Sequence, residues 1–472
     1  MRITVIGGGP GGYTAAFEAA RCGCAVTLIE TEALGGTCLN HGCIPTKTLR
    51  ASADALTMAR RLEEYGIVGC TGLEADIPAV LERKERVVGI LRNGLERTCT
   101  HHKITLLRGT GRVVDAHTVA VKSEVGETVV VGDAVIIATG SRVQQLPGLP
   151  LDHTYIVSSD DVLALTHLPK RLVIVGGGVV GCEMACIYRA FGSDVTVIEG
   201  MDRLLPMPAV DQDMRVLLQR EMRKQKIRVL LGKTLTDVCV ADGVVKGKIS
   251  PSPLLECSCS SDNASLEADM VLVTVGRAPA TDGLGLAKAG IAVDTRGWIV
   301  VDSHLQTSVP GIYAVGDVLG PSHIMLAHVA ASEGLHVVDC LCGGNTQPMC
   351  YDNMPSAIFT APEIGEVGLS EDMARAQGIQ VVCGTAQMRE LGKAHAMGEL
   401  AGLFKIVAEA TSGRVLGVHI IGVHASDMVA EAGVAITSGL TVHQLARTVH
   451  AHPTLAEGVC EAARAVCHAM ES

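Results

Sequence analysis

The sequence contains few aromatic residues, no excess of positive charge and no long apolar run. Its 472 residues include one Trp, four Phe and six Tyr, so stacking on exposed nucleic-acid bases is disfavoured. Lys and Arg total 39 against 50 Asp and Glu, and the net charge of −11 argues against a nucleic-acid partner. No apolar run reaches the roughly 20 residues that a membrane-spanning helix needs. We therefore expect neither a nucleic-acid-binding protein nor one that spans a membrane.

We also expect no signal peptide, and cysteine usage points to a reducing compartment. Met1 and Arg2 lead straight into an apolar segment that predicts a strand, so we expect no transit peptide. The 17 cysteines are odd in number and form no regular framework. We expect most of them to be reduced and packed as small hydrophobic residues, and we predict a cytoplasmic location.

The chain is long enough for about three domains, and 48% of its residues are hydrophobic, which is ample for sizeable cores. Its clearest organisation is an internal repeat, because residues 2–30 and 171–199 align without a gap. Each copy reads as an apolar strand, a glycine-rich turn, a helix and a second strand that ends in an acidic residue, Glu30 or Glu199. This order predicts two dinucleotide-binding units.

The glycines of each turn have a specific task in such a unit. They let the backbone approach a pyrophosphate at the start of a helix, and the acidic residue then accepts hydrogen bonds from the adenosine ribose. The alternative, an α/β repeat that binds nothing, is the weaker interpretation. Two dinucleotide sites in one chain indicate relayed electron transfer. The glycines concerned are Gly7, Gly9 and Gly12 in the first copy and Gly176, Gly178 and Gly181 in the second.

Cys38 and Cys43 are separated by four residues in the segment 35–47, which reads GGTCLNHGCIPTK. Two thiols at this separation can close a small disulfide ring if the backbone turns between them, and Gly42 supplies freedom to turn. A short, strained ring is easily reduced, which suits a catalytic disulfide. The alternative for an isolated C-x4-C is two buried free cysteines. The flanking residues decide between these interpretations.

This segment resembles the redox-active segment of the flavoprotein disulfide reductases, the class I pyridine nucleotide-disulfide oxidoreductases, and within them most resembles the dihydrolipoamide dehydrogenases. Further segments resemble the second FAD motif of that family (307–317), its connecting segments (109–111 and 138–141) and the stretch along the flavin (325–328). The resemblance implies FAD in the first unit and NAD in the second. Beyond the repeat, it implies cofactor binding by Gly36, Thr37, Lys47, Gly111, Thr139, Gly140, Gly276, Arg277, Gly316, Asp317, Met325, Leu326, Ala327 and His328.

The nucleotide of the second unit is expected to be NAD and not NADP. The Glu199 carboxylate would repel a ribose 2′-phosphate, and no Arg stands at 200 or 201. Arg203 is the nearest basic residue, and we expect it to cap the following segment.

Near the C-terminus, His452 and Glu457 have the spacing of a carboxylate that orients an imidazole. The segment resembles the catalytic acid/base pair of the family, which reaches the disulfide of the other subunit. The segment 355–368 resembles the start of the family's interface domain. The resemblance therefore implies a homodimer whose active site is built from both chains.

Roles follow from the resemblance residue by residue. Cys38 would exchange with the substrate, and Cys43 would lie against the flavin and form a thiolate charge-transfer complex with it. Lys47 would stand near flavin N5 and pair with Glu183, for which the alternative is a surface ion pair of little value. His452 would take the proton from the attacking substrate thiol.

The sequence departs from the family pattern at three places. His41 stands where the family usually carries Val, Ala280 replaces a common Asn, and two extra residues lie between Asp317 and Met325. We expect His41 to be packed or exposed; a protonated His41 that lowers a cysteine pKa is the alternative. No metal is expected, because these cysteines and histidines lie outside any metal-binding motif: Cys257, Cys259, His101, His102, His419 and His424.

The predicted fold class is α/β, with two Rossmann-like dinucleotide-binding domains and a C-terminal α+β dimerisation domain. We expect the FAD domain at 1–147 and 276–347, the NAD domain at 148–275 and the interface domain at 348–472. The predicted activity is oxidation of protein-bound dihydrolipoamide with transfer of electrons to NAD. The lipoyl group is expected to arrive on a partner, either the acyltransferase of a 2-oxo acid dehydrogenase complex or the glycine cleavage carrier protein.

Two other functions stay open at this point. One is an NAD(P)H-dependent reductase of another low-molecular-weight disulfide such as mycothione, for which NADP-type basic residues after the 195–199 strand would be the sign. The other is a flavin-bound scaffold without turnover, against which the joint presence of Cys38, Cys43, His452 and Glu457 argues.

Overall fold

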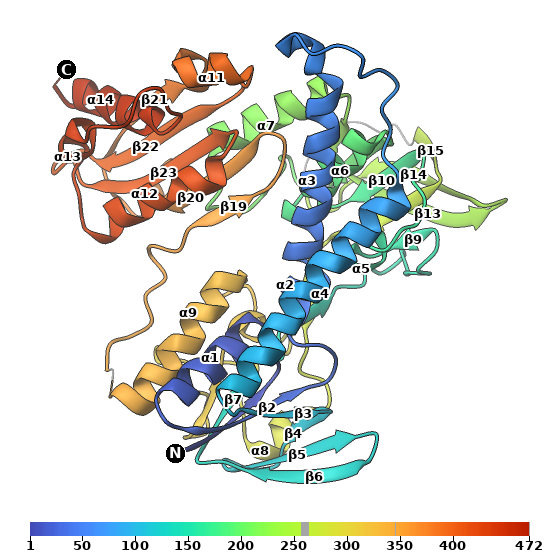
Figure 1. Ribbon diagram of the computed structural model, residues 1–472, viewed down its shortest axis with the longest axis vertical. Coiled ribbons are helices and arrows are strands. Elements are labelled where there is room, and N and C mark those ends of the chain that lie inside the picture. Colours follow the sequence, from blue (N-terminus) through green and yellow to red (C-terminus); the bar gives the residue numbers. More distant parts are fainter. Residues whose placement is uncertain (256–263, 345, 472) are drawn as a thin grey trace.

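A computed structural model describes residues 1–255, 264–344 and 346–471. Figure 1 shows three bodies: one with the N-terminus and α9, one around β10 and β14, and one that contains the C-terminal helices. Each body is built on its own five-stranded sheet. Within the described residues, no helix is long and apolar enough to cross a lipid bilayer.

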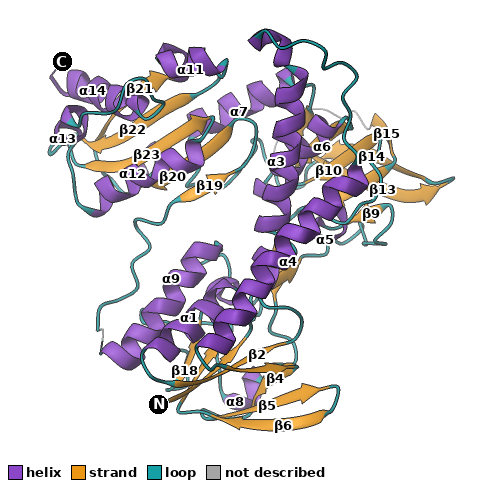
Figure 2. Ribbon diagram, in the orientation of Figure 1, coloured by secondary structure: helices purple, strands orange, loops and turns teal. Residues whose placement is uncertain are grey.

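The first body has a parallel sheet in the order β18-β7-β1-β2-β3, whose strands are apolar because both faces are covered. Helices α1 and α9 pack on each other at one face, and a three-stranded antiparallel sheet, β4-β5-β6, shares the core of the other face (Figure 2). The elements are β1 (Arg2–Ile6), α1 (Pro10–Arg21), β2 (Ala25–Glu30), β3 (Thr105–Arg108), β4 (Thr110–Val113), β5 (Thr118–Ser123), β6 (Gly126–Val131), β7 (Ala134–Ile137), α8 (Leu286–Ala289), β18 (Ile312–Ala314), η2 (Gly316–Leu319), α9 (Ala327–Val338) and η3 (Asp339–Gly343).

The second body repeats this plan with a parallel sheet in the order β12-β11-β10-β16-β9 and a separate antiparallel sheet β13-β14-β15. A two-stranded sheet, β8-β17, joins segments before and after this body. The elements are β8 (Ser141–Val143), β9 (Ile156–Val157), α5 (Ser159–Val162), β10 (Arg171–Val175), α6 (Val179–Phe191), β11 (Asp194–Glu199), α7 (Gln212–Lys224), β12 (Arg228–Leu231), β13 (Lys233–Ala241), β14 (Val244–Pro251), β15 (Ala264–Ala268), β16 (Met270–Val273) and β17 (Arg277–Pro279).

The third body is an antiparallel sheet in the order β19-β20-β23-β22-β21, with α12 packed against β20 and β23, and α14 packed against β21 and β22. Its strands are β19 (Ser356–Ile358), β20 (Glu363–Gly368), β21 (Val381–Gln387), β22 (Leu403–Glu409) and β23 (Val415–Gly422). Its helices are α10 (Glu371–Ala376), η4 (Met388–Glu390), α11 (Gly392–Met397), α12 (Ala425–Thr437), α13 (Val442–Arg447) and α14 (Glu457–Glu471).

The predicted fold class, two Rossmann-like domains and a C-terminal α+β domain, is confirmed. The aligned segments 2–30 and 171–199 both form a strand, a helix and a second strand, at matching positions. The strands of the three sheets lie within the predicted FAD, NAD and interface ranges, but the exact domain boundaries stay a prediction.

A pair of long helices connects the three bodies. Helix α2 (Gly36–Asn40) is followed by α3 (Cys43–Arg60) and η1 (Leu62–Tyr65), and α3 packs against α4 (Ile77–His101) and α6 (Figure 1). At the end of α3, Arg60 donates to the carbonyl of Ala190 in the second body (2.7 Å). Arg61 then pairs with Glu399 in the third body (2.5 Å). The helix that begins at Cys43 is thus tied to both other bodies at its far end.

Candidate active site

The two glycine-rich turns leave room for a phosphate at the start of a helix. Gly7 has φ +106°, and a Cβ there would lie 2.2 Å from the carbonyl oxygen of Ala138. A Cβ on Gly12 would lie 1.9 Å from the carbonyl oxygen of Gly7. Gly9 caps α1, and a Cβ there would meet nothing nearer than 3.8 Å, so the space in front of this helix is open. The turn therefore fits a pyrophosphate held by backbone N–H groups.

The second turn has the same construction. Gly176 has φ +111°, with Thr274 O at 2.5 Å from an added Cβ, and Gly181 would meet Gly176 O at 2.0 Å. Gly178 caps α6, and in the described part of the chain a Cβ there would have no heavy atom of another segment within 4 Å. Both turns are thus shaped by close backbone contacts and open at the helix start, as a dinucleotide requires.

The carboxylates that end β2 and β11 are held by backbone N–H groups. Gly8 N donates to Glu30 (2.6 Å). In the second unit, Gly177 N and Met201 N donate to Glu199 at 2.5 and 2.7 Å, and Glu199 is buried. Each carboxylate is therefore fixed beside its glycine turn, where the ribose of a nucleotide would lie.

Arg203 does not cap the following segment, so that expectation is wrong. Its guanidinium pairs with the adjacent Asp202 (2.7 Å), and half of the Arg203 side chain is exposed. The N-cap of α7, the next helix, is Asp211, whose own side chain accepts from Asp213 N. The guanidinium charge is therefore balanced by Asp202, which leaves Glu199 as the buried ionisable side chain at the end of β11.

The segments predicted to hold the flavin meet in the first body. Ser141 donates to Asp317 (2.7 Å), and Arg277 donates to the carbonyl oxygen of Ser141 (2.7 Å) while its Nε lies 3.7 Å from Asp317. Thr139 Oγ1 is buried and has no hydrogen-bond partner among the described residues. An unpaired buried hydroxyl beside the first glycine turn fits a ligand that would complete its hydrogen bond.

The buried carboxylate of Glu333 holds the backbone next to Asp317. Gly316 N donates to Glu333 (2.6 Å) and the Tyr351 hydroxyl donates to its other oxygen (2.8 Å). Burial raises the pKa of Glu333. The predicted binding residues did not include Glu333, Ser141 or Tyr351. Of these, only Ser141 had a signal in the sequence, because it ends the segment 138–141 that resembles a connecting segment of the family.

The other residues predicted to bind the flavin lie in several elements or in the loops between elements. Leu326 caps α9, and His328 Nε2 lies 2.7 Å from the carbonyl oxygen of Pro355, so this imidazole contacts the segment that enters the third body. Gly111 is packed in β4, where a Cβ would lie 2.9 Å from Ile6. Gly36 and Thr37 begin α2, Gly140 and Gly276 have positive φ, Gly316 begins η2, and Met325 and Ala327 flank the cap of α9.

The two cysteines of the predicted redox pair lie at the junction of α2 and α3. Cys38 is in α2 and Cys43 is the first residue of α3; both are thiols in this structure, as are all described cysteines. A hydrogen bond from Cys38 lowers the pKa of Cys43 to about 7, helped by the charge of Lys47, while the same contact raises the pKa of Cys38. The reduced pair is therefore a Cys43 thiolate held by a Cys38 thiol.

Gly42 makes the turn between the cysteines, but without a left-handed backbone. Its φ is −144°, and a Cβ there would lie 3.0 Å from the carbonyl oxygen of Thr37. Glycine is thus used for close approach. His41 is about half exposed and lies 3.5 Å from Glu32, so of the two expected positions, packed or exposed, the structure has the exposed one.

Lys47 and Glu183 lie in contact beside the cysteine pair. The Lys47 ammonium donates to both Glu183 oxygens at 3.0 and 2.8 Å, and Glu183 is buried in α6. Phe359 completes the group: its backbone N–H donates to Glu183 (2.9 Å) and its ring lies 4.4 Å from the ammonium. Tyr13 also lies near the two cysteines. Burial raises the pKa of its hydroxyl, and the charges of Cys38 and Cys43 raise it further. The pair is buried on the carboxylate side, unlike a surface ion pair.

His452 and Glu457 are hydrogen-bonded to each other and far from the cysteines of the same chain. His452 Nδ1 lies 2.9 Å from Glu457, whose second oxygen accepts from Thr454 N (2.9 Å). The His452 side chain is 77% exposed. Figure 1 shows α14, which begins at Glu457, at the far side of the third body from α2 and α3. Nothing in the described part of one chain joins this imidazole to Cys38.

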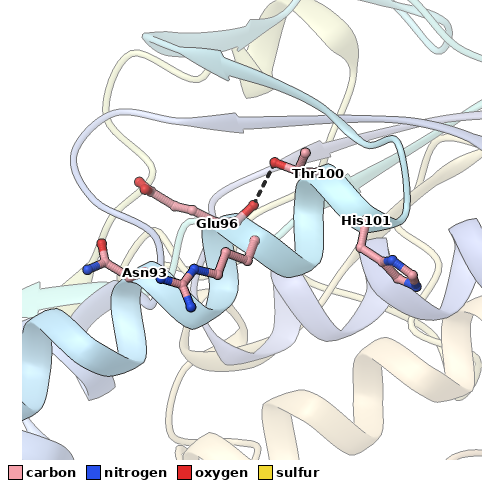
Figure 3. Close-up of a pocket in the computed structure, with 5 residues that line it drawn as sticks. Asn93, Glu96, Thr100 and His101 are labelled. Carbon is pink, nitrogen blue, oxygen red and sulfur yellow. Dashed lines mark hydrogen bonds between the residues drawn. The ribbon is translucent and has the colours of Figure 1, made fainter.

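A shallow depression elsewhere lies on the exposed surface of α4 (Figure 3). It is lined by Asn93, Glu96, Arg97, Thr100 and His101, and the Thr100 hydroxyl donates to the carbonyl oxygen of Glu96 (3.0 Å). Apart from His101, for which no metal was expected, it contains none of the residues singled out in the sequence.

The histidines without a sequence motif have ordinary positions. His419 is buried between Glu366 (3.2 Å) and the carbonyl oxygen of Leu369 (3.1 Å). His424 is exposed and lies 4.0 Å from Asp427. Cys257 and Cys259 lie outside the described residues.

The site defines the class of flavin- and nicotinamide-dependent disulfide oxidoreductases. It combines two dinucleotide-binding units, a cysteine pair beside the first unit and an exposed histidine–carboxylate pair on a separate domain. Comparison with known proteins supports this class. Residues 1–334 match the family "Pyridine nucleotide-disulphide oxidoreductase", and residues 354–463 match its dimerisation domain. The chain belongs to this family; it is an oxidoreductase that uses FAD and NAD and forms a homodimer.

Individual relatives span almost the whole chain. A dihydrolipoyl dehydrogenase of Chlamydia muridarum is 39% identical over 97% of this chain and 95% of its own length. The mitochondrial dihydrolipoyl dehydrogenase 1 of Arabidopsis thaliana is 37% identical over 98% of this chain and 90% of its own. Among solved structures, LpdA from Mycobacterium tuberculosis has a TM-score of 0.90 at 27% identity, covering 98% of this chain and 99% of that one.

Proposed function

We propose that this chain is a dihydrolipoamide dehydrogenase, which oxidises protein-bound dihydrolipoamide to lipoamide and passes two electrons through FAD to NAD. The observation that carries the proposal is the Cys38–Cys43 pair, in which one sulfur is stabilised as a thiolate with a pKa of about 7. The near-full-length similarity to dihydrolipoyl dehydrogenases supports the choice of substrate.

In the proposed reaction, His452 of the partner subunit takes the proton of one substrate thiol. The substrate thiolate attacks Cys38 Sγ, the Cys38–Cys43 bond breaks, and Cys43 leaves as a thiolate. The low pKa of Cys43 favours this step, because a sulfur of low pKa leaves faster. Glu457 holds the imidazole in place, because its carboxylate lies 2.9 Å from His452 Nδ1.

The second substrate thiol then attacks the substrate sulfur that is bound to Cys38. Lipoamide forms, the mixed disulfide breaks, and Cys38 takes up the proton of that second thiol. The raised pKa of Cys38 and the lowered pKa of Cys43 match this outcome, a thiol beside a thiolate. Bound FAD and NAD supply the acceptors that return the pair to the disulfide.

The residues that would hold these cofactors are those described above. For FAD they are the first glycine turn, Glu30, Thr139 and Asp317; for NAD they are the second turn and Glu199. We further propose that the lipoyl group is carried by the acyltransferase of a 2-oxo acid dehydrogenase complex or by the glycine cleavage carrier protein. The cytoplasmic location stays a prediction.

One comparison of rates tests the proposal. We expect NAD-dependent oxidation of dihydrolipoamide to exceed NADPH-dependent reduction of a panel of low-molecular-weight disulfides, mycothione included. The reverse ranking would replace the proposal with the disulfide-reductase alternative. Anaerobic addition of dithiol addresses the scaffold alternative, because flavin that stays oxidised would mean a protein without turnover.

A further inference from the structure

A second cluster of metal-ligating side chains lies in the first body, apart from the cysteine pair at the junction of α2 and α3. His304, His336 and Cys340 each present one ligand atom, and these atoms all lie within 4.8 Å of one another. His336 is in α9, Cys340 is in the turn η3 that follows, and His304 comes from the segment before β18. No sequence motif joins them, because 304 and 336 are distant along the chain.

The geometry of the cluster is that of ligands around one ion. His336 and Cys340 are four residues apart at the end of a helix, so their side chains share one face. Cys340 Sγ lies 3.6 Å from His336 Nε2. Zinc–sulfur and zinc–nitrogen bonds at the tetrahedral angle place their two ligand atoms about 3.6 Å apart. The His304 and His336 rings lie nearly parallel, with centroids 6.2 Å apart.

Charge and burial also suit a cation. His336 is buried, so an ion held by its imidazole would be partly shielded from water. The exposed carboxylates of Asp302 and Asp339 lie near Cys340 and attract a cation to the cluster. His304 and Cys340 are partly exposed, so an ion has a path from solution.

We propose that His304, His336 and Cys340 form a binding site for a divalent transition metal of the zinc class. Two imidazoles and one thiolate are a ligand set that Zn²⁺ accepts, with the fourth position left for water or a carboxylate. Binding releases the Cys340 proton and joins the 302–306 segment to the end of α9. This site is independent of the proposed reaction.

The test is a metal titration of the FAD-containing dimer with Zn²⁺ against a chromophoric chelator. Wild-type protein is compared with Cys340→Ser, His304→Gln and the matched control Cys342→Ser. Cys342 is two residues from Cys340 but contacts Cys24 instead (3.4 Å), so it tests for metal at another thiol pair. Metal at the redox cysteines contributes equally to all four proteins and cancels in the comparison.

We expect wild type and Cys342→Ser to bind one more equivalent of Zn²⁺ per chain than Cys340→Ser. We expect His304→Gln to bind this equivalent at least about tenfold more weakly. Co²⁺ should give a thiolate-to-metal absorption band in wild type that is lost in Cys340→Ser. Zn²⁺ should also raise the Tm of wild type and not that of Cys340→Ser.

Equal stoichiometry in wild type and Cys340→Ser would overturn the site and leave an ordinary thiol–imidazole hydrogen bond. Loss of the equivalent in Cys342→Ser alone would also overturn it, because the metal would then lie at Cys24 and Cys342. If Cys340→Ser loses its FAD and does not fold, the partly exposed His304→Gln decides the question, since unchanged affinity in that variant rejects the site.

Discussion

At the scale of single residues, two sulfur atoms a few residues apart are given opposite protonation states. Cys38 donates to Cys43, and this contact, aided by the Lys47 charge, lowers the pKa of Cys43 to about 7 from the ordinary thiol value of about 8.5. Cys43 is therefore mostly a thiolate above pH 7 and mostly a thiol below it. The same contact keeps Cys38 protonated.

The hydrogen bond between Cys38 and Cys43 predicts how the ionisation of Cys43 depends on pH. In the reduced enzyme, thiolate absorbance should rise with a midpoint near pH 7. Cys38→Ala should raise this midpoint towards the ordinary value of about 8.5, because the donor is lost. Cys38→Ser keeps a donor and should raise it less. Equal midpoints in the Ala and Ser variants would show that the hydrogen bond is not the cause.

A second prediction concerns the disulfide of the oxidised protein. In oxidised protein, alkylation without reductant followed by peptide mapping should find Cys38 and Cys43 joined by a disulfide, with the other 15 of the 17 cysteines mostly free. Fully alkylated Cys38 and Cys43 in oxidised enzyme would remove the basis of the proposed reaction.

Glu199 should set the choice of nucleotide. Its carboxylate would accept a hydrogen bond from the ribose 2′-hydroxyl and repel a 2′-phosphate, so we expect NAD to be preferred over NADP by about 1–3 kcal/mol. The measurement is kcat/KM with each nucleotide in wild type and in Glu199→Gln, where the preference should shrink. Equal kcat/KM for NAD and NADP in wild type would mean that this carboxylate does not face the ribose.

At the scale of elements, α3 brings its first residue, Cys43, and Lys47 one turn later against α6, which supplies Glu183. The charges act on the Cys43 thiolate with opposite signs: Lys47 lowers its pKa and Glu183 raises it. Lys47→Gln should therefore raise the thiolate midpoint of the reduced enzyme, and Glu183→Gln should lower it. A pH titration of both variants checks the two directions, and shifts of the same sign would contradict the assignment.

The first turn of α14, which begins at the Glu457 partner of His452, is packed without spare space. A Cβ on Gly458 would lie 2.3 Å from the ring of Phe404, which is fully buried. Gly458→Ala should destabilise the protein by about 1–3 kcal/mol through overpacking, measured by denaturant unfolding. The control is Gly94→Ala in α4, where a Cβ meets nothing within 4 Å and alanine favours the helix.

These elements also show how far the sequence alone can predict the site. The repeat 2–30 and 171–199 and the contact of Lys47 with Glu183 were predicted, because motif spacing reports local geometry and resemblance supplies the pairing. The sequence did not predict that the Thr139 hydroxyl is unpaired or that the Phe359 ring lies over the Lys47 ammonium. Both features depend on packing between segments that are distant along the chain. The cluster of His304, His336 and Cys340 was missed for the same reason.

At the scale of the whole molecule, the proposed site needs two chains. His452 pairs with Glu457, the first residue of α14, and Figure 1 shows α14 at the far side of the third body from α2 and α3. His452→Gln should slow dithiol attack by roughly 10²–10⁴-fold while FAD and NAD still bind. Single-turnover reduction by dihydrolipoamide measures the attack, and an unchanged rate would remove His452 from the reaction.

Subunit mixing tests the shared site directly. His452→Gln and Cys43→Ser, each nearly inactive, should form mixed dimers with one intact site of two after mild unfolding and exchange. Half of the dimers are mixed, so activity should return towards a quarter of wild type. Demonstrated mixed dimers without recovered activity would place the site within one chain.

The anchoring of α3 has a mechanical consequence. A helix of 18 residues is about 27 Å long, and here one end carries Cys43 while the other is fastened to Ala190 and Glu399. The body that contains Glu399 is also the one that would deliver His452 to the opposite subunit. In the proposed dimer, a tilt of that body in one protomer would move Cys43 of the same protomer and also the His452 that serves the other site, so it would change the geometry of both sites.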